Sequence, residues 1–308
     1  MTDRVWLASY PKSGNTWLRI LIGCLALKDG EQVDINKSLE RGGIASARSP
    51  FDHLTLIDSA LLTHDEIDAL RPRVYEEMVR RQDELDTEED EQDGAAPAST
   101  PVRFVKVHDA YTQTAQGEPL LAGLHFAKGA IVIVRDPRDV APSLANHNRS
   151  SIDTAIRFMN DADAAFCSRT DRLPYQLRQR LPGWSGHVAS WLEQRDIPVH
   201  LVRYEDLKRD TAGTLLAAMQ FAGYAVTEAD AVRAVSLASF GKLQAQERET
   251  GFSEWKDRGA NGRWFFRRGE TGAWRDELTA EQVSRIEAAH GAMMTRLGYE
   301  LSTANARA

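Results

Sequence analysis

The sequence has few cysteines and no long apolar run, and both absences narrow the class of protein. Two cysteines, Cys24 and Cys167, lie far apart in 308 residues and outside any Cys-x-x-Cys pattern. Such cysteines are typical of reduced core residues, not of a disulfide scaffold or a zinc site. The longest apolar run near the start, 20–27, has eight residues, whereas a membrane-spanning helix needs ~20. We therefore expect a cytoplasmic protein without a membrane partner.

Signatures of other classes are missing as well. Residues 1–15 have no basic leader followed by an apolar core, so no secretory signal is expected. No group of His, Cys, Asp and Glu has the spacing of metal ligands, so no metal is expected. Charged residues make up 27% of the chain and hydrophobic residues 42%, which excludes a chain that is disordered as a whole.

The net charge of −7 is a local property of the chain. Residues 83–93 contain eight carboxylates and no Lys or Arg, and without them the formal charge changes from −7 to +1. The acidity therefore does not argue against an anion-binding site, and no nucleic-acid partner is expected. Because like charges repel, the range 83–101 is predicted to be a flexible acidic insert. Residues 1–308 are otherwise predicted to form a single domain.

Short apolar segments alternate with helical patterns along the chain. Buried strands are predicted at residues 5–9, 102–107, 130–134 and 199–204. Helices are predicted at 16–27, from Thr63 to a break near Pro72 and on to Gln82, after Asp136, and from Thr279 to Gly298. Strands separated by helices favour a three-layer αβα fold with a central parallel sheet.

Residues able to carry chemistry follow the ends of these strands. Lys12, His108 and Arg135 each come just after a predicted strand, and Tyr204 ends the fourth. Ligands of parallel sheets bind at the carboxyl ends of the strands. A single histidine is more often structural, but this position and the neighbouring Lys106 favour a catalytic role for His108.

The turn Tyr10-Pro-Lys-Ser-Gly-Asn-Thr-Trp17 joins the first strand to the first helix. In such a turn the backbone N–H groups and the helix dipole converge on an anion. Lys12 and the hydroxyls of Ser13 and Thr16 add a charge and hydrogen-bond donors. It is not a Walker A loop, because the lysine precedes Ser-Gly and does not follow the second glycine.

Five segments in chain order resemble the motifs of sulfotransferases that use 3′-phosphoadenosine 5′-phosphosulfate (PAPS), most of all cytosolic-type bacterial members. Together they span nearly the whole chain. The segments are residues 10–17, Lys106-Val-His108, Ile133-Val-Arg-Asp-Pro-Arg-Asp-Val-Ala-Pro-Ser143, Arg203-Tyr-Glu-Asp206 and Phe266-Arg-Arg-Gly-Glu-Thr-Gly-Ala-Trp274. The resemblance implies a P-loop-NTPase-like sulfotransferase fold. It also implies transfer of a sulfuryl group from PAPS to a small-molecule hydroxyl, with release of 3′,5′-adenosine bisphosphate (PAP).

The resemblance assigns a role to each residue of the site. His108 would be the general base, Lys12 would stabilise the leaving phosphate oxygen, and Lys106 would be a second cation near the transferred group. The donor would be bound by its 5′-phosphate, its adenine and its 3′-phosphate, and the residues so assigned are Lys12, Ser13, Gly14, Asn15, Thr16, Trp17, Arg135, Ser143, Tyr204, Phe240, Arg267, Arg268 and Gly269.

Two departures from the family pattern affect these assignments. Asn15 replaces the usual hydroxyl residue, although its amide can also donate a hydrogen bond. Pro142 precedes Ser143 inside a predicted helix, where it should kink the axis and shift Ser143. The family's dimerisation segment is poorly matched by residues 275–280, so the sequence predicts no particular oligomer.

The acceptor is not identified by the sequence. Residues 30–82, 145–191 and 244–266 are expected to wall its pocket, for an acceptor such as a natural-product scaffold or a phenol. Phe51, His53, Phe252, Trp255 and Trp264 are candidate pocket residues, each more often a core or loop anchor. Two other functions stay open: a P-loop kinase, which would need Mg²⁺, and a nucleotide-binding module without catalysis.

Overall fold

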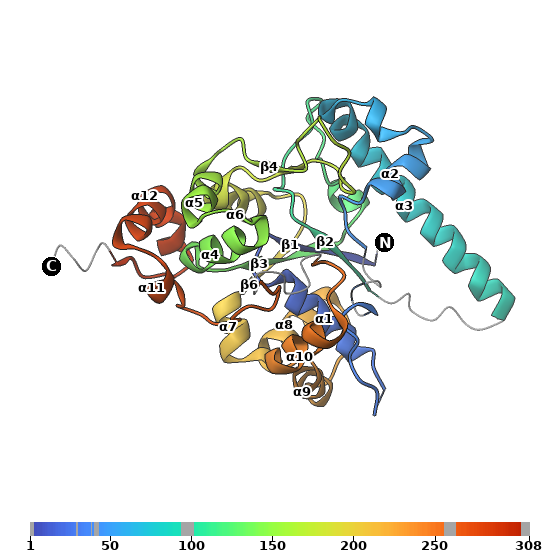
Figure 1. The fold of residues 1–308 in the computed structure, drawn as a ribbon. Helices are drawn as coiled ribbons and strands as arrows, with labels where there is room; N and C mark the ends of the chain where they lie inside the picture. Colours follow the sequence, from blue (N-terminus) through green and yellow to red (C-terminus); the bar gives the residue numbers. More distant parts are fainter. Residues whose placement is uncertain are drawn as a thin grey trace.

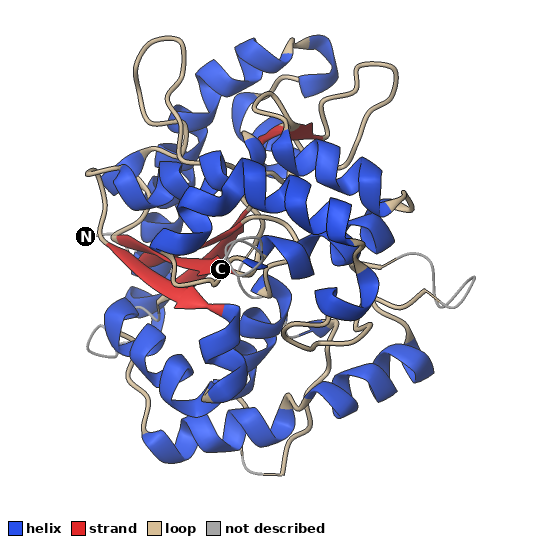
Figure 2. Cartoon of the chain, turned by 90° about the vertical axis from the view of Figure 1, so that its left-hand side faces the viewer, coloured by secondary structure: helices blue, strands red, loops and turns tan. Residues whose placement is uncertain are grey.

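A parallel sheet lies at the centre of the computed structural model, which describes residues 3–28, 30–37, 39, 43–93, 102–255 and 263–302. Four of the described strands form this sheet in the order β2-β1-β3-β6. Their bounds are β1 Arg4–Ser9, β2 Arg103–Val107, β3 Gly129–Val134 and β6 Val199–Arg203. The sheet, drawn in red in Figure 2, lies among helices. A short antiparallel pair, β4 Ala165–Phe166 and β5 Gln179–Arg180, lies apart from it.

Helices cover both faces of the sheet (Figure 1). One face carries α1 Asn15–Leu25, α8 Thr211–Ala222, α9 Glu228–Leu237 and α10 Phe240–Thr250, and the other carries α4 Pro137–Asn148, α5 Ile152–Asn160, α6 Gly183–Glu193 and α12 Ala280–Arg296. The remaining helices are α2 Arg48–Thr55, α3 His64–Asp93, α7 Tyr204–Arg209 and α11 Trp274–Glu277, with 3-10 turns at Ser59–Leu61 and Gly123–His125. The predicted three-layer αβα fold with a parallel sheet is confirmed.

The alternation of side chains along the strands explains the two layers. Successive residues of a strand point to opposite faces of the sheet. Leu7 and Ile131 pack with α1 and α8 in one core, whereas Trp6 and Val132 pack with α4 and α6 in the other. Because the central strands β1 and β3 are buried on both faces, residues 5–8 and 130–134 are continuous apolar runs, as expected for a parallel sheet.

The helix α3 differs from the sequence prediction in two ways. It runs from His64 to Asp93 without the break expected at Pro72. A proline inside a helix costs ~3 kcal/mol, and the burial of Tyr75 and Val79 beyond it offsets that cost. The range 83–93 is helical, not part of a flexible insert, because Glu and Gln are good helix formers. Residues 94–101 lie outside the described residues, and the single domain stays a prediction.

Other boundaries agree more closely. The fourth strand ends at Arg203, and Tyr204 begins α7. The predicted capping box of Thr279 and Gln282 begins the last helix.

Cys24 and Cys167 are free thiols. Among the described residues, no helix is both long and apolar enough to cross a membrane.

Candidate active site

A cavity of about 430 Å³ gathers nearly every residue assigned to the site by sequence. Its lining includes Lys12, Gly14, Asn15, Thr16, Trp17, Lys106, His108, Arg135, Ser143, Tyr204, Phe240, Arg267, Arg268 and Gly269. Ser143 is thus in the cavity despite Pro142, which lies inside α4. Ser13 is the exception: it is fully buried, does not line the cavity, and its Oγ has no hydrogen-bond partner among the described residues.

The turn before α1 depends on a glycine. Gly14 is the N-cap of α1 and has a φ of 108°. Residues other than glycine disfavour this left-handed region. A Cβ built there would lie 2.6 Å from Cδ2 of Tyr204. Lys12 also has a positive φ, 70°, which is backbone strain of a kind that gathers at functional sites. The first N–H groups of α1 have no intrahelical acceptor and are free to bind an anion.

The amide of Asn15 is not directed at an anion, contrary to expectation. Its Nδ2 donates to the carbonyl oxygen of Leu7 at 2.8 Å and to Oγ of Ser9 at 3.2 Å. The side chain therefore ties the start of α1 to β1. Any contribution of Asn15 to phosphate binding is left to its backbone N–H.

The hydrogen bonds of His108 fix which ring nitrogen carries the proton. Nδ1 lies 2.8 Å from the carbonyl oxygen of Ser9, which can only accept, so Nδ1 carries the hydrogen. Nε2 is then the unprotonated nitrogen. Burial first, and the charge of Lys106 second, lower the pKa of His108 well below its usual value. His108 is therefore a neutral imidazole with an unprotonated Nε2, and it lines the cavity.

Lys12 lies close to an aromatic ring and to other cations. Its Nζ is 3.8 Å from the centroid of the Phe265 ring, a cation–π distance. Burial, and then the charges of Lys106 and Arg135, lower the pKa of Lys12 to about 7. An anion beside Lys12 would favour its charged form again.

Lys106 is paired with a carboxylate that sequence reasoning missed. Its Nζ lies 3.3 Å from Oε2 of Glu254, whose other oxygen accepts from Nη1 of Arg19 at 2.7 Å. The hydroxyl of Thr16 donates to the same Oε2 at 3.4 Å. Glu254 lies in a stretch without helical or strand periodicity, so no pattern in the sequence pointed to it.

Arg135 joins two loops and keeps one donor unused. Its guanidinium donates to the carbonyl oxygens of Lys12 at 3.4 Å and Glu270 at 2.8 Å, and it lies 4.5 Å from the ring centroid of Tyr204. Nε is buried and has no hydrogen-bond partner in the described part of the chain. A buried, unsatisfied guanidinium N–H is costly in a protein without its ligand, and it fits a bound phosphate.

The loop of residues 266–274 is held against the rest of the site by the side chain of Asp139. Asp139 accepts the N–H groups of Gly272 at 2.7 Å and Trp274 at 2.9 Å. Gly269, at φ 63°, approaches the Phe240 ring so closely that a Cβ would lie 2.3 Å from Cε2. Arg267 and Arg268, also from this loop, both pair with Glu277.

The aromatic residues assigned to adenine lie near one another. The ring centroids of Trp17 and Tyr204 are 6.0 Å apart in an edge arrangement, and the indole N–H of Trp17 donates to the carbonyl of Ala238 at 3.1 Å. Nζ of Lys208 lies 5.2 Å from the Trp17 ring centroid and 5.7 Å from that of Phe240. These three aromatic rings all line the cavity.

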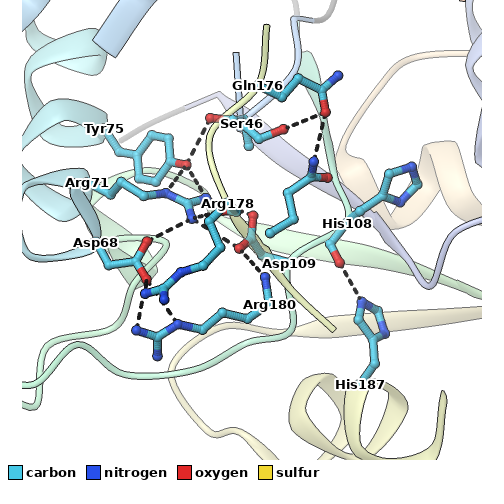
Figure 3. A network of polar contacts seen from close by, with 12 residues as sticks. Ser46, Asp68, Arg71, Tyr75, His108, Asp109, Gln176, Arg178, Arg180 and His187 are labelled. Atoms are coloured by element: carbon cyan, nitrogen blue, oxygen red, sulfur yellow. Dashed lines mark hydrogen bonds and ion pairs between the residues drawn. The ribbon is translucent and has the colours of Figure 1, made fainter. Parts of the chain in front are cut away.

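A buried polar network anchors the chain just after His108 (Figure 3). Asp109, fully buried, accepts from Nη1 of Arg71 at 3.0 Å and from Nη2 at 2.8 Å. Arg71 also donates to the hydroxyl of Tyr75. On the other side, Nε2 of His187 donates to the carbonyl of His108 at 3.0 Å. Breaking a buried ion pair by removing one partner costs ~3–5 kcal/mol, so this network fixes the backbone that carries His108.

The expected acceptor ranges do line the cavity, but through other residues than those named from sequence. The lining beyond the donor groups includes Ile44, His147, Phe166, Gln176, Gln179 and Phe265. Phe51, His53, Phe252, Trp255 and Trp264 are absent from it, and Phe51 belongs to a small core with α3. Ile44 pairs with Lys106 in a parallel β-bridge, and Nε2 of Gln179 donates to Oε1 of Gln176 at 2.8 Å.

The cavity lining contains more positively charged than negatively charged side chains. Five lining residues of the described chain are Lys or Arg and three are Asp or Glu. Within the described residues, no group of three or more His, Cys, Asp and Glu is arranged to hold a metal ion. The arrangement can bind a polyanion and accept a proton at a neutral imidazole.

Comparison with known proteins gives one family for nearly the whole chain. The family model described as "Sulfotransferase domain" matches residues 2–298. The chain is similar to flavonol 3-sulfotransferase of Flaveria bidentis, with 25% identity over 293 residues, 92% of this chain and 79% of the relative. It is also similar to cytosolic sulfotransferase 17 of Arabidopsis thaliana, with 22% identity over 291 residues, 92% of this chain and 71% of the relative.

A solved structure shares the fold. The mouse sulfotransferase SULT7A1 complexed with PAP aligns with a TM-score of 0.55 and 18% sequence identity, over 95% of this chain and 84% of that chain. This likeness agrees with the central parallel sheet flanked by helices that the topology gives.

Proposed function

The chain belongs to the sulfotransferase family, and from that premise we propose that it transfers the sulfuryl group of PAPS to a hydroxyl of a small molecule, with His108 as the base. Sulfuryl transfer itself, and therefore an enzyme of the sulfotransferase class, follows from the family. The identity of the donor, the roles of the residues and the acceptor class are the content of the proposal.

The observation that carries the proposal is the hydrogen bond between Nδ1 of His108 and the carbonyl of Ser9, in a cavity that is also lined by cations. Because Nδ1–H is bonded to the carbonyl of Ser9, Nε2 can accept the proton of an acceptor hydroxyl. Lys12, Lys106 and Arg135 line the same cavity. The acceptor oxygen would attack sulfur in line as the bond from sulfur to the 5′-phosphate oxygen breaks. Lys12 would stabilise the negative charge that develops on the leaving oxygen.

The donor fits the residues that are present. PAPS carries roughly four negative charges, and arginine forks suit fixed phosphates. The unpartnered Nε of Arg135 and the N–H groups at the start of α1, which have no intrahelical acceptor, favour an anionic ligand. Ser143, Arg267, Arg268 and Gly269 would join Arg135 at the 3′-phosphate, and Trp17, Tyr204 and Phe240 would contact adenine.

The acceptor is proposed to be a small, partly aromatic alcohol or phenol. The apolar part of the cavity lining comes from Ile44, Phe166 and Phe265. Hydrogen-bonding groups come from the amides of Gln176 and Gln179. One relative is named for a flavonol, a phenolic small molecule. We also propose a cytoplasmic location. Two observations support it: both cysteines are free thiols, and one relative is named as cytosolic.

A thermal-shift titration tests the donor. A ligand that binds only the folded state at 100 times its Kd stabilises the protein by ~2.7 kcal/mol. We expect PAP to raise Tm clearly and ATP with Mg²⁺ to leave it unchanged. The reverse order would favour a kinase. Stabilisation by PAP without transfer from labelled PAPS to any member of a phenol and alcohol panel would favour a binding module without catalysis.

The pKa of Lys12 gives a testable pH dependence. Below about 7 the side chain is a cation in the free enzyme, and above about 7 it loses its charge. Because kcat/KM reports the free enzyme, kcat/KM for PAPS should fall as pH rises through about 7. Lys12→Arg should lower activity overall but abolish this alkaline fall, since arginine stays charged. Initial rates measured across this pH range check the expectation, and identical profiles for both proteins would contradict it.

A further inference from the structure

The carboxylate of Glu254 accepts hydrogen bonds from side chains that the proposed function assigns to the nucleotide donor. Oε2 accepts from the hydroxyl of Thr16 at 3.4 Å and from Nζ of Lys106 at 3.3 Å. Oε1 accepts from Nη1 of Arg19 at 2.7 Å. Glu254 lines the same cavity as His108. An anionic group of the chain itself therefore contacts Thr16 and Lys106, beside the place where the 5′ end of the nucleotide is proposed to bind.

Glu254 is negatively charged under any ordinary assay condition. Burial alone would raise its pKa, but the charges of Lys106 and Arg19 outweigh burial and lower the pKa to about 2. Two anions cannot share the same few donors without strong repulsion in a partly buried site. A bound 5′-phosphate and the Glu254 carboxylate would therefore compete.

We propose that Glu254 sets the affinity of the donor site by competing with the 5′-phosphate of the nucleotide for Thr16, while it also holds Lys106, the cation assigned to the neighbouring transferred group. The inference rests on the proposed function, because it requires a nucleotide with a 5′ anionic group. Competition weakens the binding of substrate and product alike. Its benefit is faster release of PAP, a step that limits turnover in many enzymes.

The surroundings of Glu254 allow its carboxylate to leave without undoing the turn that carries it. That turn is held by the N–H of Trp255, which donates to the carbonyl of Phe252 at 2.9 Å, and by the N–H of Ser253, which donates to Oδ1 of Asn36 at 2.7 Å. Neither bond uses the Glu254 side chain. Arg19 keeps a separate bond to the carbonyl of Leu39 at 2.9 Å.

Glu254→Gln tests this by removing the charge and keeping the shape. Isothermal titration with PAP should show binding about tenfold tighter than wild type, which equals ~1.4 kcal/mol. Adenosine 3′-phosphate, which lacks the 5′ group, should bind both proteins equally. Glu249→Gln, an exposed position on α10, makes the same change in net charge and should leave PAP affinity unchanged. Stopped-flow release of PAP from Glu254→Gln should slow by a similar factor.

Each contrary outcome has a distinct meaning. If wild type binds PAP and Glu254→Gln binds it no more tightly, the competition is refuted and the proposed function stands. Equal tightening toward PAP and adenosine 3′-phosphate would show a general charge effect and also refute it. If wild type does not bind PAP at all, the proposed function fails and this inference with it. Glu254→Ala gives a second removal of the charge should the glutamine variant not fold.

Discussion

His108→Ala is expected to lower kcat by about 10²–10⁴-fold, the usual contribution of a general base. The affinity for PAP should stay the same, because Lys12 and Arg135, which are proposed to bind the phosphates, follow β1 and β3, whereas His108 follows β2. Initial rates with labelled PAPS measure the first effect, and isothermal titration with PAP measures the second. His125→Ala, at an exposed position, is the matched control and should leave both unchanged.

Two results would contradict the role of His108. A folded His108→Ala variant with wild-type kcat would show that the proton goes elsewhere. Loss of PAP binding with unchanged Tm would place the ring in the nucleotide site and not at the acceptor hydroxyl. His108→Gln is a second variant for this test. The glutamine side chain fills part of the space of the ring, and its amide N–H can donate to the carbonyl of Ser9. It supplies no basic nitrogen.

Arg135→Ala is expected to weaken PAP binding by about 10–100-fold, because a hydrogen bond to a charged group contributes ~1.5–3 kcal/mol. The same substitution should weaken AMP, which lacks the 3′-phosphate, far less. The difference between the two ligands isolates the 3′-phosphate from the rest of the nucleotide. Titration calorimetry with both ligands measures it, and Arg209→Ala, exposed on α7, is the control.

The contacts of Arg135 with two loops decide how this result is read. The guanidinium bonds to the carbonyls of Lys12 and Glu270, so its removal could also loosen the site as a whole. Loosening would weaken PAP and AMP equally, and that outcome would remove Arg135 from the 3′-phosphate role. Arg135→Lys keeps the charge but not the fork, and should lie between wild type and alanine for PAP.

The parts of the fold that the sequence predicts well are those set by local pattern. Residues 5–8 of β1 and 130–134 of β3 are continuous apolar runs, and Lys12 and Arg135 follow the ends of these strands. Parallel strands bring those ends to one edge of the sheet, so the sequence alone suffices to place Lys12, His108 and Arg135 together. Their hydrogen bonds depend on partners far along the chain and could not be foreseen.

The contacts that sequence reasoning missed are long-range and polar. Arg71 and Asp109 form a buried ion pair although one comes from α3 and the other follows β2. Glu254 reaches Lys106 from a segment without periodicity. The amide of Asn15 turns toward β1 because Ser9 and Leu7 offer acceptors there. Each pairing is decided by tertiary proximity, which one sequence does not encode in any local pattern.

The β-bridge between Ile44 and Lys106 of β2 has a consequence for changing which acceptor the enzyme selects. The N–H of Ala45 donates to the carbonyl of Lys106 at 2.9 Å, and the N–H of Lys106 donates to the carbonyl of Gly43 at 3.3 Å. Main-chain bonds therefore hold the segment around Ile44 in register, whatever its side chain. A library at position 44 would reshape the wall of the cavity while leaving the imidazole aligned, which makes this position a starting point for altering the choice of alcohol.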